Sequence, residues 1–337
     1  MRDIGATKRR RCVLALLALA MAGRPGVPGA QPSTRVRRIG YLGPPVDTAP
    51  HLLKAFQDGL RDVGYVEGRN VTVDYRWTAQ RGALLSDTAL LANARELIAL
   101  KPDVFAASID VAILAARQVA GTTPIVMMNV SDPVALGLLD DLAHPGGNIT
   151  GLTRLSSELI TKNLELLVET IPGATRLAML VSPPGLGSLT VTNARQAAGR
   201  RGLPLDFVEV KSARDLDAAF AAIRRGGAEA LIVPGSGVFF AERARIAELA
   251  LAQRLPAVFA YTENVEAGGL LAYSASSADN YRRAGGFIDK ILRGTKPGDI
   301  PVEQPTKFEL AINLRTARSM GIVFPRSVLL RADRVVE

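Results

Sequence analysis

The sequence alternates short apolar runs with segments whose apolar residues recur at helical spacing, and it completes this alternation twice. Strands that alternate with helices form parallel sheets, and right-handed crossovers place the helices on both faces of each sheet. The pattern therefore predicts an α/β protein with two doubly wound lobes. The apolar runs lie at residues 39–42, 71–77, 104–107 and 124–130 in the first series, and at 177–181, 205–210, 230–233 and 257–260 in the second.

The length and composition agree with two globular lobes. A chain of 337 residues exceeds one ordinary hydrophobic core, and 48% hydrophobic with 22% charged residues excludes a disordered protein. After the second series, a strand at 270–274, a helix at 278–292, a Gly/Pro linker and a strand at 307–313 remain. Such a tail is long enough to cross back between the lobes.

The basic charge is concentrated at the N-terminus. The formal net charge is +9, but residues 1–38 hold nine basic groups and one acid, which leaves the other 299 residues with only +1. A basic run at 8–11 precedes an apolar run at 12–22, which is too short to span a bilayer. Residues 1–30 are therefore expected to be a signal peptide, cleaved after Ala22 or Ala30, with Arg10–Arg11 leaving twin-arginine export as an alternative. No nucleic-acid partner is expected.

Few residues offer catalytic or metal chemistry. Cys12 is the only cysteine and lies in the expected signal peptide, and His51 and His144 are isolated. There is no G-x-S-x-G elbow, Walker A loop or H-E-x-x-H motif. The segment 184–187 imitates a dinucleotide loop but lacks its third glycine. We therefore expect no cofactor, no metal and no enzymatic activity.

Polar and aromatic residues follow several of the predicted strands. Ligands bind at the carboxyl edge of open α/β sheets, so these residues are the candidate binding site. A carboxylate there can bind an ammonium group, serines can bind a carboxylate, and rings can stack on an apolar group. The candidates are Gly43, Pro44, Trp77, Ser108, Asp110, Asn129, Asp132, Ser182, Ser236 and Tyr261.

A structural role is the alternative for several of these candidates. Asp110 and Asp132 are also typical helix N-caps, and Trp77 also suits a hydrophobic core. Asp132–Pro133 is expected at the carboxyl end of the strand at 124–130. A short helical segment, a chain break at Pro145–Asn148 and a new helix beyond Gly151 are expected after it.

Four segments together resemble a known family. They are Tyr41–Gly43, the run Gly64–Asn70 with Tyr75–Trp77, the stretch Ser131–Val134 through Pro145–Gly151, and Pro301–Leu310. These segments look like the ABC-transporter substrate-binding proteins that include tryptophan- and tyrosine-type amino-acid binding proteins. The resemblance extends from about residue 37 to residue 337.

The resemblance implies a type I periplasmic-binding fold, in which two lobes joined by crossing strands close on a ligand. It implies a first lobe of residues 36–150 plus 276–305 and a second lobe of 151–275 plus 306–337. The chain departs from the family at Ser108–Val111, where members often have Gly-Thr-Pro-Ala. Because this turn faces the expected cleft, the identity of the ligand is the property that can least be transferred from the family to this chain.

These observations lead to one functional hypothesis with two rivals. We expect an exported, periplasmic, monomeric solute-binding protein of an ABC importer, which binds a small organic solute, with aromatic amino acids favoured, and delivers it to an ABC permease. One rival is a periplasmic sensor that presents its solute to a membrane receptor. The other is an exported enzyme acting in the cleft, disfavoured because no nucleophile–base pair is evident. A cytoplasmic repressor is disfavoured because nothing before Arg38 resembles a helix-turn-helix.

Overall fold

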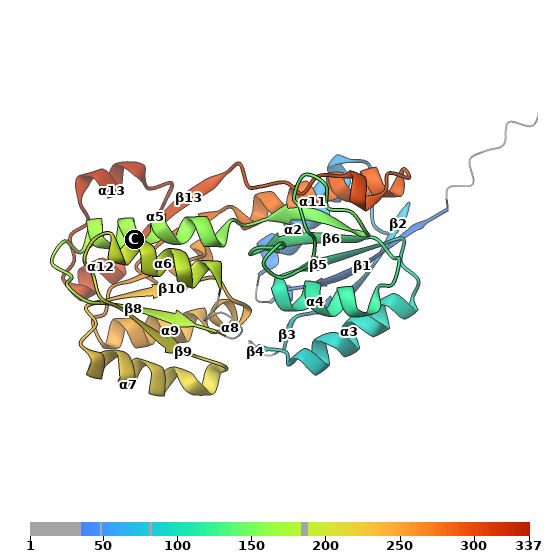
Figure 1. Cartoon of the computed structure of the whole chain (residues 1–337). Coiled ribbons are helices and arrows are strands. Elements are labelled where there is room, and N and C mark those ends of the chain that lie inside the picture. Colours follow the sequence, from blue (N-terminus) through green and yellow to red (C-terminus); the bar gives the residue numbers. More distant parts are fainter. Residues whose placement is uncertain (1–34, 48, 81–82, 183–187) are drawn as a thin grey trace, which may run out of the picture. The chain divides into compact units, whose positions relative to one another are not determined.

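The computed structural model describes residues 35–47, 49–80, 83–182 and 188–337. Val36–Glu337 form one compact unit, which contains two large sheets and one two-stranded sheet (Figure 1). The expected signal peptide lies outside the described residues. Among the described residues, no helix is long and apolar enough to cross a membrane.

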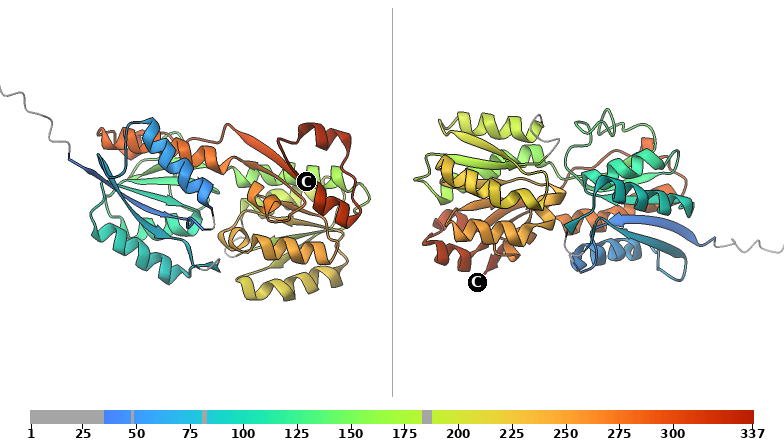
Figure 2. Two further views of the ribbon diagram at one scale, coloured as in Figure 1. Left: turned by 180° about the vertical axis from the view of Figure 1, so that it is seen from behind. Right: turned by 90° about the horizontal axis from the view of Figure 1, so that it is seen from below.

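The first sheet is parallel and has the strand order β2-β1-β5-β6-β7. Its strands are β1 (Arg37–Gly43), β2 (Val71–Trp77), β5 (Val104–Ser108), β6 (Ile125–Val130) and β7 (Ile149–Thr153). Alternate strand residues face opposite sides: Ile39 and Tyr41 pack beneath α2 (Pro50–Asp62) and α11 (Ser277–Leu292). Leu42 packs on the other face beneath α3 (Asp87–Ala99) and α4 (Asp110–Val119). Helices therefore cover both faces of the sheet (Figure 2).

The second sheet has the order β14-β13-β12-β11-β10-β8-β9 and contains one antiparallel pair, β12 with β13. Its strands are β8 (Leu177–Val181), β9 (Leu205–Glu209), β10 (Ala230–Val233), β11 (Ala257–Phe259), β12 (Leu271–Ala275), β13 (Phe308–Asn313) and β14 (Arg334–Val336). One face packs against α5 (Ser156–Thr170), α6 (Leu189–Gly199) and α13 (Arg326–Arg331). The other packs against α7 (Leu216–Gly226), α8 (Gly237–Ala241) and α9 (Arg243–Ala252).

The remaining elements are short. They are the hairpin of β3 (Ala79–Gln80) with β4 (Ala83–Leu84), the helices α10 (Thr262–Glu266) and α12 (Leu314–Met320), and the 3-10 turns η2 (Ala213–Asp215) and η3 (Pro297–Asp299).

Three segments connect the two sheets. The first runs from β7 into α5, the second from β12 into α11, and the third from residue 301 into β13. The third lies alongside the first, because Glu303 N donates to Gly151 O at 2.9 Å and Thr153 N donates to Glu303 O at 3.0 Å. The C-terminal tail thus returns to the first sheet through α11 before it ends in the second.

The structure differs from the sequence-based expectation at two places. Residues 149–153 form strand β7 of the first sheet, where no strand was predicted, and the helix expected beyond Gly151 starts at Ser156. The segment after Asp132 consists of turns where a short helix was expected. The expected lobe boundary between residues 150 and 151 falls inside β7, and the lobe limits stay a prediction.

Candidate functional site

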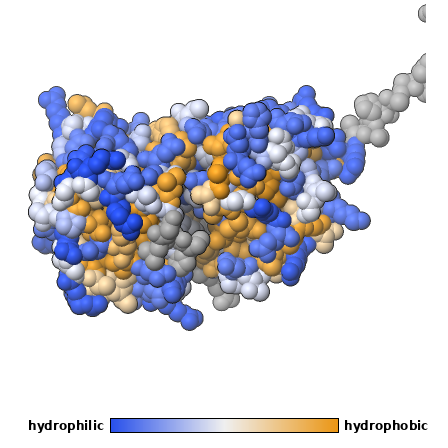
Figure 3. Space-filling view, viewed as in Figure 1, coloured by the Kyte–Doolittle hydropathy of each residue, from blue (hydrophilic) through white to orange (hydrophobic). Residues whose placement is uncertain are grey.

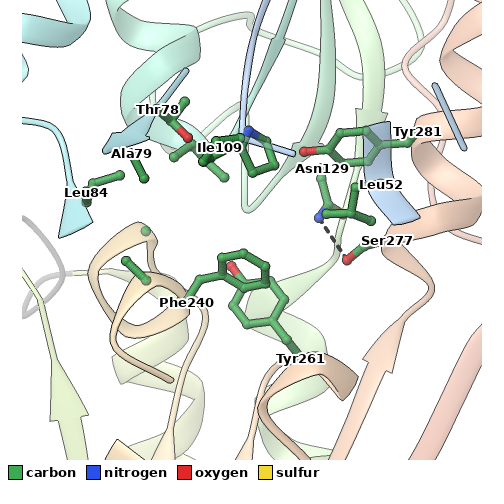
Figure 4. Close-up of a pocket in the computed structure, with 14 residues that line it drawn as sticks. Leu52, Thr78, Ala79, Leu84, Ile109, Asn129, Phe240, Tyr261, Ser277 and Tyr281 are labelled. Atoms are coloured by element: carbon green, nitrogen blue, oxygen red, sulfur yellow. Dashed lines mark hydrogen bonds between the residues drawn. The ribbon is translucent and has the colours of Figure 1, made fainter. Parts of the chain in front are cut away.

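A pocket lies where residues of the two sheets meet, and it holds about 480 Å³ counted out to its open mouth. Only about 30 Å³ of this space can hold the centre of a water molecule. Figure 4 shows Thr78, Ala79, Leu84 and Ile109 on one side, facing Phe240 and Tyr261 on the other. Hydrophobic residues also gather beside the junction of the two lobes on the molecular surface (Figure 3). The lining comprises Pro44, Pro45, Leu52, Thr78, Ala79, Leu84, Ile109, Asn129, Gly237, Phe240, Ala241, Tyr261, Ser277 and Tyr281.

Strand ends deliver four of these residues. Pro44 follows β1, Ile109 follows β5, Asn129 lies near the end of β6, and Tyr261 follows β11. Each of these strands runs parallel to its named neighbours, so the carboxyl ends of β1, β5 and β6 lie at one edge of the first sheet, and that of β11 lies at the carboxyl edge of the parallel strands of the second sheet. The pocket is therefore located where a doubly wound fold binds ligands.

Two lining residues have unusual backbone conformations. Ile109 has φ +64° and Asn129 has φ +65°, in the left-handed region. Asparagine tolerates this region, but for a β-branched residue such as isoleucine it is an outlier, and such strain clusters at functional sites. The side chain of Ile109 also approaches the second lobe, since a Cβ added at Gly237 would lie 3.4 Å from its Cδ1.

The Asn129 side chain is held by a network of buried polar groups. Its Nδ2 donates to Ser277 Oγ at 3.1 Å (Figure 4), and its Oδ1 accepts from Asn280 Nδ2 at 3.1 Å. Asn280 Nδ2 also donates to Thr153 O at 2.9 Å. The network joins β6, β7 and α11, so it stabilises two of the connections between the sheets.

The aromatic part of the lining comes from both lobes. Phe240 and Tyr261 meet edge to face, with ring centroids 5.1 Å apart and planes at 71°. Tyr281 projects from α11 on the opposite side (Figure 4). Burial raises the pKa of Tyr261 and of Tyr281, so both hydroxyls stay protonated at neutral pH. Such rings suit an apolar or aromatic ligand.

A histidine–carboxylate hydrogen bond joins the two lobes near the pocket. His51 Nε2 of α2 lies 3.1 Å from Glu263 Oε1 of α10, and the Glu263 side chain is 7% exposed. Burial opposes ionisation of Glu263, but the hydrogen bond from His51, the His51 charge and Arg243 outweigh it and lower the pKa of Glu263 below its ordinary 4.5.

Acidification is therefore expected to destabilise the protein partly through Glu263. A carboxylate with a lowered pKa stabilises the folded state above its ordinary pKa, and this contribution is lost as the pH falls through the folded value. Between about pH 6 and about pH 3, the melting temperature of Glu263→Gln should fall less steeply than that of the wild type. Differential scanning calorimetry measures both, with Glu248→Gln on the exposed face of α9 as control. Parallel curves for wild type and Glu263→Gln would contradict the assignment.

Three of the ten predicted site residues line the pocket: Pro44, Asn129 and Tyr261. Gly43 precedes the lining residue Pro44 in the chain. The Tyr41 ring occupies the space beside Gly43, because a Cβ at Gly43 would lie 2.4 Å from that ring. Trp77 is half-buried and stacks on Tyr75, with ring centroids 5.6 Å apart, as part of the first hydrophobic core. That these residues bind the ligand stays a prediction.

Three of the other predicted residues, Asp110, Asp132 and Ser236, make local hydrogen bonds. Asp110 accepts hydrogen bonds from Ser131 N at 2.8 Å and Ser131 Oγ at 2.6 Å. Asp132 Oδ1 accepts from Ala135 N at 3.0 Å, in a turn. Ser236 Oγ accepts from Phe239 N at 3.1 Å and so caps α8. Ser108 is fully buried at the end of β5, and Ser182 is half-buried directly after β8.

Sequence reasoning missed the lining residues that helices supply. Ser277 and Tyr281 lie on α11, where their spacing of four is the same as that of ordinary core positions. Phe240 lies in the short helix α8. One sequence signal could have indicated Phe240. Ser236 is a typical helix N-cap shortly after a predicted strand, so the first turn of a helix, which contains Phe240, is expected at the carboxyl edge of the sheet.

Comparisons with known proteins agree with this fold. The chain matches the family model described as ABC transporter substrate binding protein over residues 47–336. A tyrosine-binding protein from Clostridioides difficile strain R20291 is 25% identical over 270 residues, covering 80% of this chain and 76% of the relative.

Two solved structures share the fold, each 24% identical and covering 89% of this chain and 99% of the other. One is a conserved domain protein from Vibrio cholerae O1 biovar El Tor strain N16961, with a TM-score of 0.82. The other is an ABC domain in complex with L-Trp from Streptococcus pneumoniae, with a TM-score of 0.80. They confirm the predicted two-lobed α/β fold. Because the family model spans most of the sequence, the chain belongs to the ABC transporter substrate-binding proteins.

Proposed function

We propose that this protein is exported, binds a small aromatic solute in the pocket between its lobes, and delivers it to an ABC permease. Aromatic amino acids are the first candidates. The observation that carries the proposal is the pocket, whose lining is largely apolar and includes Phe240, Tyr261 and Tyr281. The tyrosine-binding relative and the neighbour in complex with L-Trp support the same class of solute.

Hinge closure provides the mechanism. The lining comes from both lobes, and three segments connect them. A ligand that contacts Tyr281 on one side and Phe240 on the other has more contacts when the lobes are closed. Its binding therefore shifts the population toward the closed state, which a permease can distinguish from the open one.

The N-terminus supports export. The basic run at 8–11 followed by the apolar run at 12–22 is the pattern of a signal peptide. Removal of residues 1–30 would release a monomer into the periplasm, where the membrane permease is its partner. We propose binding without turnover, because the family binds solutes and the lining offers hydroxyl and amide groups without a charged side chain to act as base.

A calorimetric titration of the purified protein with the twenty amino acids and a set of aromatic acids tests the proposal. Tyrosine, tryptophan or phenylalanine should bind with a dissociation constant in the micromolar range or below, about 8 kcal/mol of binding free energy. Mass spectrometry of the recovered ligand should show it unchanged. The proposal fails if no aromatic compound binds while an aliphatic or polar one does.

A further inference from the structure

Arg154 is a buried cation next to the pocket. It follows β7 at the first connection between the lobes, is 4% exposed, and its backbone N donates to Val130 O at 2.8 Å. Its side-chain Nε and Nη1 have no hydrogen-bond partner. Within the described part of the chain, no carboxylate forms an ion pair with it.

The guanidinium group lies against the wall of the pocket. Its Cζ is 4.5 Å from the ring centroid of Tyr261, a lining residue. The Arg154 charge favours ionisation of the Tyr261 and Tyr281 hydroxyls, and a hydrogen bond between the Arg154 and Tyr261 side chains acts in the same direction, so both oppose the rise in pKa that burial causes. The guanidinium thus lies within electrostatic reach of lining residues from both lobes.

A glycine makes room for this position. A Cβ added at Gly235 would lie 2.5 Å from Nη2 and 2.6 Å from Nη1 of Arg154, so any larger residue would require the guanidinium group to move. Gly235 precedes Ser236 and the lining residue Gly237 at the start of α8. The loop after β10 is therefore built around the Arg154 side chain.

Burial of this arginine has an energetic cost that nothing in the described residues offsets fully. The contact with the Tyr261 ring stabilises the positive charge of Arg154, but the N–H groups at Nε and Nη1 still lack hydrogen-bond acceptors. An unpaired buried cation is costly, and it is balanced when an anion binds. Guanidinium groups bind carboxylates through two parallel hydrogen bonds. The neighbouring Thr153 Oγ1 is also buried without a partner and can add a further donor.

The carboxylates around the pocket are already engaged. Asp110 accepts two hydrogen bonds from Ser131, and Glu263 pairs with His51. No charged side chain lines the pocket itself. A ligand would thus find nearby a cation that has no ion-pair partner among the described residues, and no free carboxylate for an ammonium group.

We propose that Arg154 binds the carboxylate of the solute, and that the site takes aromatic carboxylic acids whether or not they carry an amino group. This inference rests on the proposed function, since it assigns the polar end of the same aromatic ligand. Arg154 is then the residue that distinguishes acids from amines at this site.

Three probes that share one ring test the proposal by calorimetry: tyrosine, its des-amino acid hydroxyphenylpropionate, and tyramine, which lacks the carboxylate. The two acids should bind the wild type with affinities within about tenfold of each other. Tyramine should bind roughly 30-fold more weakly or worse, as expected when one partner of a buried charge pair is missing. The methyl ester of hydroxyphenylpropionate should also bind roughly 30-fold more weakly than the free acid.

Variants assign the effect to Arg154. Arg154→Gln should weaken binding of hydroxyphenylpropionate by roughly 30-fold or more, and Arg154→Lys should restore part of the affinity. The melting temperature of unliganded Arg154→Gln should not fall, because an unpaired buried charge is removed. Arg195→Gln is the matched control, since Arg195 lies over the Phe207 ring at 4.9 Å, on an exposed part of α6, and should not affect binding.

The outcomes separate this inference from the proposed function. Equal affinities for tyramine and the acids, or an Arg154→Gln protein that binds the acid as the wild type does, would overturn the role of Arg154 and leave an aromatic-binding protein. Failure of every aromatic compound to bind would overturn both. If Arg154→Gln does not fold, equal affinity of the wild type for the acid and its methyl ester overturns the role of Arg154 without a variant.

Discussion

Replacing Gly285 by alanine is expected to lower the free energy of unfolding by about 3 kcal/mol, the upper part of the range for overpacking a core. Gly285 lies in α11 against α2, where the two helix backbones touch. A Cβ at Gly285 would lie 2.2 Å from Gly59 O, and a Cβ at Gly59 would lie 1.9 Å from Arg282 O. Because both clashes are with backbone atoms, no side-chain rotation can relieve them, and the helices must move apart.

The next residue of the same helix provides the control. A Cβ at Gly286 meets nothing within 4 Å. Gly286→Ala should therefore stabilise the protein by up to about 1 kcal/mol, through the lower conformational entropy of alanine in the unfolded chain. Urea unfolding followed by circular dichroism measures both changes. A similar effect of the two substitutions would show that α2 and α11 do not pack this closely.

The Gly285 contact also concerns binding, because α11 carries Ser277 and Tyr281 into the pocket. A helix pushed away from α2 moves both residues relative to Asn129, whose side chain is hydrogen-bonded to Ser277. Gly285→Ala should therefore weaken solute binding in addition to lowering stability, whereas Gly286→Ala should leave the affinity unchanged.

The apolar runs predicted most of the strands because buried parallel strands need continuous hydrophobic sequence. β6 is such a run, since all six residues from Ile125 to Val130 are buried. β7 escaped prediction because its apolar run is interrupted by Gly151 with φ +137°, a glycine at which an added Cβ would lie 2.1 Å from Met127 O. A close backbone approach of this kind leaves no periodic signal in the sequence.

Position along a strand was sufficient to predict two of the residues that line the pocket. Asn129 and Tyr261 follow from the rule that parallel strands deliver their carboxyl ends to one edge. The side chains of Asp110, Asp132 and Ser236 are at comparable positions, but each bonds to a nearby backbone or serine group. Local hydrogen bonding of short polar side chains competes with ligand binding, and the sequence alone does not decide between them.

The residues that were missed depend on distant contacts. Tyr281 and Asn280 reach the ends of β6 and β7 because α11 returns to the first sheet after the second sheet is nearly complete. Arg154 directly follows the strand that was not predicted. Its burial depends on the loop at Gly235, about eighty residues later in the chain. Neither relation is visible in the periodicity of one segment.

Phe240→Ala is expected to weaken binding of the aromatic solute by roughly 30-fold to 100-fold, about 2 to 3 kcal/mol, as for other aromatic anchors in binding sites. The Phe240 ring lines the pocket, contacts Tyr261 edge to face and packs against the hydrophobic core of the first lobe. Arg243 supports it, with Nη1 donating to Phe240 O at 2.9 Å. Phe240 is half-buried before binding, so its truncation should affect affinity more than the stability of the unliganded protein.

Phe308→Ala separates loss of the pocket wall from general loss of an aromatic ring. Phe308 is also half-buried and packs on a tyrosine, with its ring centroid 6.0 Å from that of Tyr273, but it lies on β13 and does not line the pocket. Calorimetric titration with tyrosine should give wild-type affinity for Phe308→Ala and the reduced affinity for Phe240→Ala, while Phe240→Leu should retain part of the binding. If Phe240→Ala lowered only the melting temperature and bound as the wild type does, the ring would belong to the contact between the lobes and the solute would bind elsewhere.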